Sequence, residues 1–213
     1  METTMDPHPS PRAEVYLLIA TLLRQCPHEP MLNFLRELET EPANNDMVKA
    51  WQSLNSAAKH VEPSQLEDEF FELFIGIGRG EVVPFASWHL TGSLMEKPLA
   101  ELRQTLARLG FERDSHVKEP EDHLAALCEV MAMLVPHDEV TQQQFFNNHI
   151  APWFHRFTEQ LNEAKHAQFY RSVAQLISAF LTVEQVRFTR SPAHHTSTRI
   201  EVKDATEYGP SSL

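Results

Sequence analysis

Residues 164–187, AKHAQFYRSVAQLISAFLTVEQVR, decide the fold class of this chain. Their apolar side chains recur every three or four positions, which is the spacing of a long helix with one buried face. The stretch that starts at Arg12 repeats this spacing. The apolar positions of these two stretches are Val15, Leu18, Ile19, Leu22, Leu23, Phe169, Val173, Leu176, Ile177 and Phe180.

Prolines and glycines divide the rest of the chain into further helices. Proline is favourable in the first turn of a helix, where no backbone N–H is required, and glycine often follows the last turn. Pro63, Pro98 and Pro120 therefore predict helix starts, Asp46 a helix cap and Gly110 a helix stop. We expect helices over roughly residues 12–23, 31–38, 46–58, 63–75, 98–109, 120–134, 149–161 and 164–187, with a short piece around Phe145 and Phe146.

No stretch alternates apolar and polar residues between hairpin turns, as the strands of a sheet would. Six glycines are also few for a sandwich or barrel with many tight turns. The sequence predicts an all-α, single-domain bundle of about eight to ten helices over residues 12–189. We expect residues 1–11, which contain three prolines, to form a loose lead-in, and residues 190–213 to form a mobile tail.

Composition limits the classes of function. The chain has 213 residues, of which 42% are hydrophobic and 23% charged, an ordinary globular balance. It contains no apolar run of about 18 residues that could cross a membrane. Its first residues lack the basic start and apolar core of a secretory signal, so we expect a cytoplasmic protein. The net charge of −12 argues against a nucleic-acid partner and would attract a basic peptide.

Motifs for metal, redox or nucleophilic chemistry are missing from the sequence. Cys26 and Cys128 lie far apart within helical patterns, which is typical of two buried thiols, and no CxxC pair occurs. The twelve histidines form no HExxH motif and no repeated ExxH pair. Glycines 76, 78 and 80 are not followed by the Lys-Ser or Lys-Thr of a phosphate-binding loop. We therefore predict no catalytic site, no metal and no cofactor.

One enzymatic alternative stays open on the sequence. Glu119, Asp122, His123 and His149 could serve a small metal-dependent hydrolase, because carboxylates and imidazoles are common metal ligands. Acidic residues at a helix start, however, also complement the helix dipole without any further role.

Aromatic and acidic residues gather around the glycines. Phe70, Phe71, Phe74, Phe85 and Trp88 lie on both sides of this segment. Grooves with aromatic walls and acidic rims accept apolar or amphipathic peptides. The residues thus indicate a helical peptide-binding protein, with acidic side chains at Glu67, Asp68, Glu69 and Glu72.

Three stretches together are similar to the TorD/DmsD/NarJ family of molybdoenzyme chaperones. Residues 69–76, EFFELFIG, and residues 84–88, PFASW, resemble the family's aromatic-x-x-Leu-Phe-x-Gly helix end and its Pro-x-x-Ser loop. Residues 119–124, EPEDHL, resemble its acidic Pro-x-Asp-His segment. The third stretch comprises His149, Trp153, Phe157 and Leu161, followed by residues 169–181.

The resemblance implies an all-α domain, in some members exchanged between the two subunits of a dimer, so we expect a monomer or homodimer. It also implies a cytoplasmic chaperone rather than an enzyme. Its partner would be an apo-molybdoenzyme, such as the catalytic subunit of a reductase or a formate dehydrogenase. The chaperone would bind that client's twin-arginine signal peptide and hold the client until the molybdopterin cofactor is inserted.

The resemblance also implies a peptide-binding site. Its apolar residues would receive the hydrophobic part of the signal, Asp122 would pair with the arginines, and His123 would either tune that pairing with pH or brace the loop. Gly78 departs from members that carry an aromatic residue there. The matching residues are Phe70, Leu73, Phe74, Gly76, Pro84, Ser87, Trp88, Asp122 and His123.

Two further alternatives concern the client. The chain could serve a molybdoenzyme subunit that is not exported and has no twin-arginine signal. It could also be a structural adaptor that stays bound to its enzyme, which the release of the complex after cofactor loading would exclude.

Overall fold

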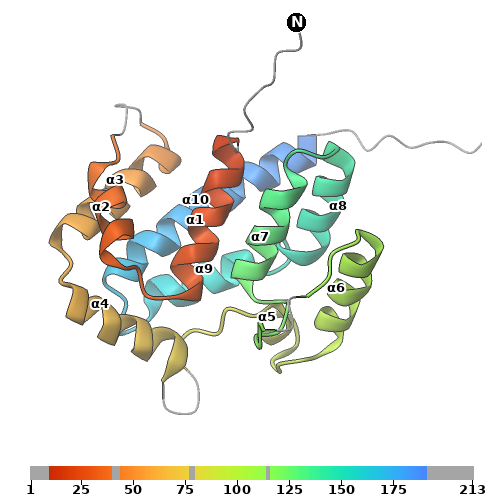
Figure 1. Ribbon diagram of the computed structural model, residues 1–213, viewed down its shortest axis with the longest axis horizontal. Coiled ribbons are helices and arrows are strands. Elements are labelled where there is room, and N and C mark those ends of the chain that lie inside the picture. Colours follow the sequence, from red (N-terminus) through yellow and green to blue (C-terminus); the bar gives the residue numbers. More distant parts are fainter. Residues whose placement is uncertain (1–9, 40–43, 77–79, 114–115, 191–213) are drawn as a thin grey trace, which may run out of the picture.

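The computed structural model describes residues 10–39, 44–76, 80–113 and 116–190, and in these residues the chain is helical without strands (Figure 1). The predicted all-α class is confirmed. The predicted lead-in and tail lie outside the described residues, apart from Ser10, Pro11 and Arg190. The elements are α1 Pro11–Arg24, α2 Glu29–Glu37, α3 Asp46–His60, α4 Pro63–Phe70, the π-helical turn η1 Phe71–Ile75, α5 Ala86–Thr91, α6 Lys97–Arg108, α7 Leu124–Leu134, α8 Glu139–His149, α9 Phe154–Glu163 and α10 Phe169–Arg190.

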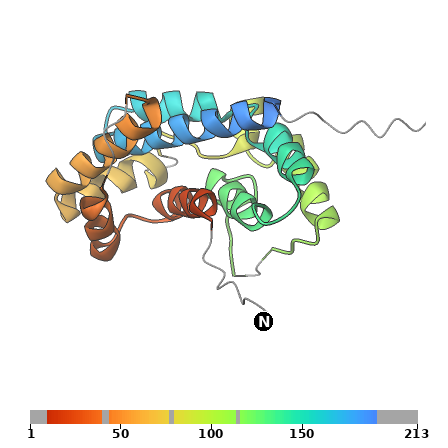
Figure 2. The ribbon, with the colours of Figure 1, turned by 90° about the horizontal axis from the view of Figure 1, so that it is seen from above.

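The helices form two layers. Helices α1 and α7 pack side by side in one layer, while α10 lies behind them with α9 and α3 (Figures 1 and 2). Helices α2, α3 and α4 gather at one end of the molecule, and α5, α6 and α8 at the other (Figure 1). Tyr16 and Ile19 of α1, Met131 of α7, and Val173 and Ile177 of α10 are buried in the core between the layers.

Several helix starts follow from local side-chain chemistry. Ser10, Asn45 and Asp138 accept hydrogen bonds from backbone N–H groups in the first turns of α1, α3 and α8, as N-cap residues do. The cap of α3 is thus Asn45, one residue before the predicted Asp46. Pro63 and Pro98 do lie in first turns, as predicted.

The helix predicted to start at Pro120 starts at Leu124 instead. Residues 120–122 form a turn, and the extended backbone of His123 makes it the N-cap residue of α7. A proline can open a helix but does not require one, and here the side-chain cap three residues later, at His123, sets the boundary.

Phe145 and Phe146 also differ from expectation. They lie in an eleven-residue helix, α8, which ends at His149. The helix expected to start at His149 is α9, which starts at Phe154. The indole N–H of Trp153 donates to the carbonyl of His149 at 2.7 Å and satisfies one of the unpaired groups at this helix end. Leu106 of α6 and Leu109, which directly follows this helix, are only partly buried.

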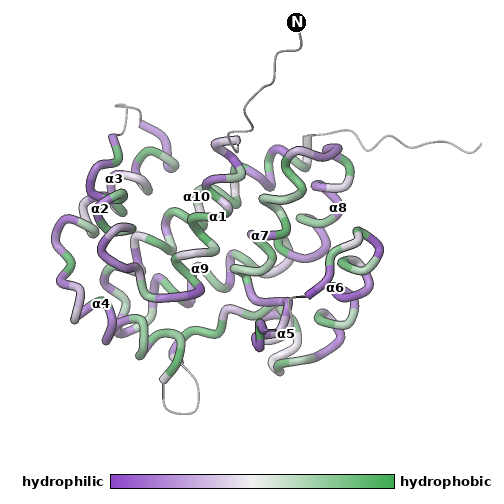
Figure 3. The backbone as a smooth tube through the Cα atoms, viewed as in Figure 1, coloured by the Kyte–Doolittle hydropathy of each residue, from purple (hydrophilic) through white to green (hydrophobic). Residues whose placement is uncertain are grey.

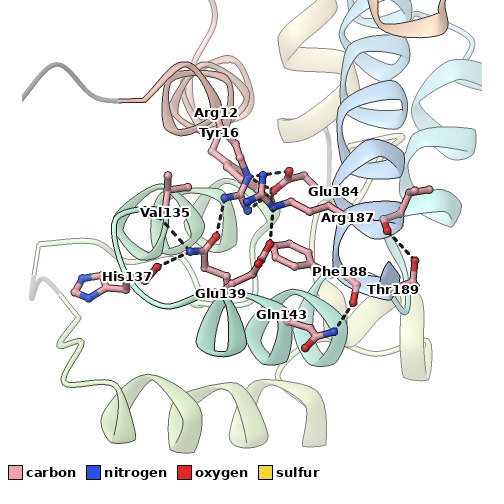
Figure 4. A network of polar contacts seen from close by, with 12 residues as sticks. Arg12, Tyr16, Val135, His137, Glu139, Gln143, Glu184, Arg187, Phe188 and Thr189 are labelled. Carbon is pink, nitrogen blue, oxygen red and sulfur yellow. Dashed lines mark hydrogen bonds and ion pairs between the residues drawn. The ribbon is translucent and has the colours of Figure 1, made fainter. Parts of the chain in front are cut away.

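A polar network joins α1, α8 and α10 (Figure 4). The guanidinium of Arg12 donates to both oxygens of the buried Glu184 carboxylate at 2.7–2.8 Å and to Oε1 of Gln142 at 2.7 Å. The Tyr16 hydroxyl donates to Oε2 of Glu184 at 2.7 Å. Because Arg12 and Glu184 lie near opposite ends of the described chain, the network holds the first helix of the bundle against the last.

No helix in the described ranges is both long enough and apolar enough to cross a lipid bilayer.

Candidate peptide-binding site

Residues 84–88 and 122–123 meet at one corner of the molecule, which we call the α5–α7 corner. Phe85 and His123 form an isolated antiparallel bridge. Ala86 N donates to the carbonyl of Asp122, and Leu124 N to the carbonyl of Pro84, both at 2.9 Å. The two motifs that carry the family resemblance are therefore held together by backbone hydrogen bonds.

Asp122 is the most deeply placed acid of this corner, with 1% of its surface exposed. Its Oδ2 accepts a hydrogen bond from Ser87 N at 2.8 Å. Its Oδ1 and the hydroxyl of Ser87 are buried and have no hydrogen-bond partner among the described residues. A buried acceptor without a partner is costly, so Oδ1 is a strong potential acceptor for a donor supplied from outside.

His123 braces the corner. Its Nδ1 accepts a hydrogen bond from Ala125 N at 3.0 Å, and its ring meets the Phe85 ring edge-on at 4.9 Å between centroids. Burial, with a smaller contribution from the positive charge of Arg24, lowers the pKa of His123 to about 3. The imidazole is therefore neutral near pH 7, which favours the bracing role over the predicted pH-sensitive one.

Ser87 and Trp88 lie in a helix, α5, which is not among the helices expected from the spacing. The helix has six residues and stops at Gly92, whose φ of 82° favours glycine. Trp88 is partly buried. Beyond it, Leu90, Leu94 and Met95 expose apolar surface, with 72% of Met95 accessible.

The other predicted site residues lie apart from this corner, on α4 and η1 (Figure 1). The rings of Phe70 and Phe74 pack against Tyr170 of α10, at centroid distances of 5.9 and 5.1 Å. Leu73 is fully buried. These three side chains mainly build the core, and Gly76 ends η1 with a φ of 44°.

An extended, largely apolar segment, residues 80–85, connects the two groups (Figure 3). It is held against η1 by hydrogen bonds from Val82 N to the Leu73 carbonyl at 2.9 Å and from Glu81 N to the Glu72 carbonyl at 3.1 Å. A Cβ at Gly80 would lie 2.2 Å from the Leu73 oxygen, so this approach requires glycine. The predicted site is thus two groups joined by a strap. Gly78, the noted departure, lies outside the described residues.

Among the acids near η1, Glu69 has a structural role. It is buried and accepts hydrogen bonds from the backbone N–H groups of Gln168, Phe169 and Tyr170 at 2.8–3.1 Å. These groups open α10, so the carboxylate caps that helix from another element. The sequence grouped Glu69 with the rim acids, and Asp68, Glu69 and Glu72 do all border a cavity of about 540 Å³.

The residues of the hydrolase alternative are engaged in other contacts. Glu119 pairs with Arg24 at 2.9 Å, His123 caps α7, and His149 lies 3.1 Å from the Thr105 hydroxyl. In the part of the chain that the structure describes, no three His, Cys, Asp or Glu side chains are placed to hold a metal ion. Of the two thiols, Cys128 is buried and Cys26 partly buried, and burial raises the pKa of both.

Comparison with known proteins identifies the family. Residues 40–159 match the family model described as nitrate reductase delta subunit. The chain belongs to this family. The match includes both the α4–η1 group and the α5–α7 corner, and the predicted membership of the TorD/DmsD/NarJ group is confirmed.

Two relatives of this chain are named chaperone protein TorD. Those of Vibrio parahaemolyticus and Aliivibrio fischeri are each 28% identical over 198 residues, which cover 81% of this chain and 92% of the relative. A crystal structure described as a redox enzyme maturation protein from Archaeoglobus fulgidus superposes with a TM-score of 0.56 at 18% identity. The superposition covers 86% of this chain and 98% of the Archaeoglobus chain, which shows that the two share a fold.

Prediction of site residues from the family motifs did not identify the apolar side chains that are accessible to a ligand. Phe71 and Ile75, four positions apart in η1, are 46% and 53% exposed, whereas their neighbours Leu73 and Phe74 pack inward. Spacing could have shown this, because Phe71 and Ile75 share a face with Asp68 and Glu72. The motif letters alone do not separate core positions from surface positions.

Proposed function

We propose that this chain is a cytoplasmic chaperone, without enzymatic activity, that binds an apo-molybdoenzyme through its twin-arginine signal peptide. It would hold that client during cofactor insertion and maturation, before export. The carrying observation is the buried Asp122 carboxylate, whose Oδ1 has no partner among the described residues. The relatives named chaperone protein TorD support the chaperone role.

The chemistry of the α5–α7 corner suits such a peptide. A guanidinium group donates charge-assisted hydrogen bonds to carboxylate oxygens, and these are among the strongest that proteins use. Leu90, Leu94 and Met95 expose apolar surface at the end of α5 and just after it. They are suited to the hydrophobic stretch of a signal peptide, while the negative net charge of the chain favours encounter with its basic end.

Calorimetric titration with a panel of twin-arginine signal peptides tests this function. We expect one peptide to bind tightly and its twin-lysine version to bind more weakly, because lysine cannot donate in the bidentate manner of arginine. Asp122→Asn should weaken binding by about 2–5 kcal/mol, since the bound guanidinium, which stays charged, loses its anionic partner. Asp46→Asn, at an exposed aspartate on α3, is the matched control.

Two results would count against the proposal. Unchanged binding by a folded Asp122→Asn variant would remove Asp122 from the site. Failure of every peptide to bind, combined with capture of a client that carries no signal, would favour a chaperone for a non-exported subunit.

A further inference from the structure

A small cavity of about 50 Å³ lies beside the α5–α7 corner. Apolar side chains of α5, α6 and α7 form much of its wall, and its polar lining consists of Glu101, Asp122, Asn148 and His149. On this measure one water molecule needs about 10–15 Å³, so the space suits a few waters or a planar guanidinium group. The cavity therefore has room for the end of an arginine side chain.

No side chain of this polar lining donates a hydrogen bond to Oδ1 of Asp122. Oδ2 of Asp122 is occupied by Ser87 N, whereas Oδ1 is buried without a partner in the described parts of the chain. His149 already shares a hydrogen bond with Thr105 through its Nε2. A carboxylate can only accept, so the group that completes this site must bring N–H or O–H donors.

Glu101 lines the same cavity from the solvent side. It lies on α6, its side chain is 56% exposed, and its Oε1 is 3.1 Å from the ammonium of Lys97, which is 82% exposed. Ion pairs this exposed contribute little to stability and exchange readily. Lys97 is thus a weakly held partner that a bound cation can replace.

We propose that the two arginines of the client signal are read by two different acids, one by Asp122 inside the cavity and the other by Glu101 at its rim. This rests on the proposed function and adds Glu101 as a residue that determines specificity. Neighbouring arginines have separate side-chain directions, so a guanidinium that reaches Asp122 leaves the other arginine outside the cavity. The second arginine stays at the rim, where it displaces Lys97 from Glu101.

Double-mutant cycles test this division of roles. Wild-type protein, Asp122→Asn and Glu101→Gln are titrated with the bound signal peptide and with versions in which either arginine is replaced by glutamine. We expect Glu101→Gln to weaken binding about fivefold. Replacing one of the two arginines should then have no further effect in Glu101→Gln, and replacing the other should have none in Asp122→Asn.

Two further variants at exposed positions complete the test, the second of them as a control. Lys97→Met should strengthen binding about two- to threefold, because it frees Glu101 from its present partner. Glu112→Gln should change nothing, since Glu112 is an exposed acid that borders a separate cavity beyond α6. Thermal unfolding of each variant shows that differences in binding do not come from misfolding.

Unchanged peptide binding by Glu101→Gln, or coupling of both acids to the same arginine, would overturn this inference while the proposed function stands. Absence of any binding by the wild-type protein would instead overturn the proposed function.

Discussion

His123 illustrates how one residue links protonation to structure. Its Nδ1 accepts the hydrogen bond from Ala125 N that caps α7. A protonated imidazole has no acceptor nitrogen, so it cannot make this bond. Burial favours the neutral form for the same side chain, and the pKa falls to about 3. The cap and the burial therefore select the same protonation state.

This linkage predicts a pH dependence of stability. An unfolded histidine titrates near pH 6.5, and the folded pKa is depressed, so the unfolded chain binds the extra proton between about pH 6.5 and pH 3. Stability should be complete above about pH 6.5 and fall as the pH drops through this window, by at most about 1.4 kcal/mol per pH unit from His123.

His123→Asn provides the matched comparison, because asparagine caps helices but does not titrate. Urea unfolding between pH 7 and pH 4 should give a shallower loss of stability for His123→Asn than for the wild-type protein. Parallel pH profiles for the two proteins would show that the imidazole is not held neutral.

At the scale of elements, Glu69 fixes α4 to the start of α10. Glu69→Gln should lower the free energy of unfolding by about 1–3 kcal/mol, because the charge that faces three backbone N–H groups is lost. Glu67→Gln, an exposed change on the same helix, should have little effect. Urea denaturation of both variants measures this, and equal stabilities would contradict the capping role.

The network around Glu184 fixes α1 to α10 in the same way. Glu184→Gln leaves the Arg12 guanidinium largely buried without its anion and should cost about 3 kcal/mol. Glu139→Gln removes a half-exposed partner of Arg187 in the same region and should cost at most about 1 kcal/mol. Similar losses in the free energy of unfolding for these two variants would show that the network does not hold α1 against α10.

For the whole molecule, helical spacing was sufficient to predict the all-α class, because a buried face repeats every three or four residues wherever the core is apolar. The starts of α7 and α8 could not be predicted in this way. His123 is an unusual cap, and Asp138 caps a helix whose polar residues hide its period. Local chemistry rather than periodicity sets these boundaries.

The candidate site was predicted only in part for a different reason. The meeting of residues 84–88 with residues 122–123 was anticipated from motifs, but the inward packing of Phe74 and the capping role of Glu69 depend on contacts with α10, about a hundred residues away. Single-sequence spacing carries no information on such contacts. Phe71 and Ile75 are a different case, because their spacing from Asp68 and Glu72 does indicate the exposed face on which the structure places them.

Hydrogen exchange of the backbone amides, measured with and without a bound twin-arginine peptide, tests the central claim most directly. We predict slower exchange on binding in residues 84–102 and 120–127, which carry the α5–α7 corner and the rim of its cavity. Exchange along α3 and α10 should stay unchanged. Protection confined to the groove of about 1000 Å³ that α3, α9 and α10 line, with none at the α5–α7 corner, would contradict this location of the site.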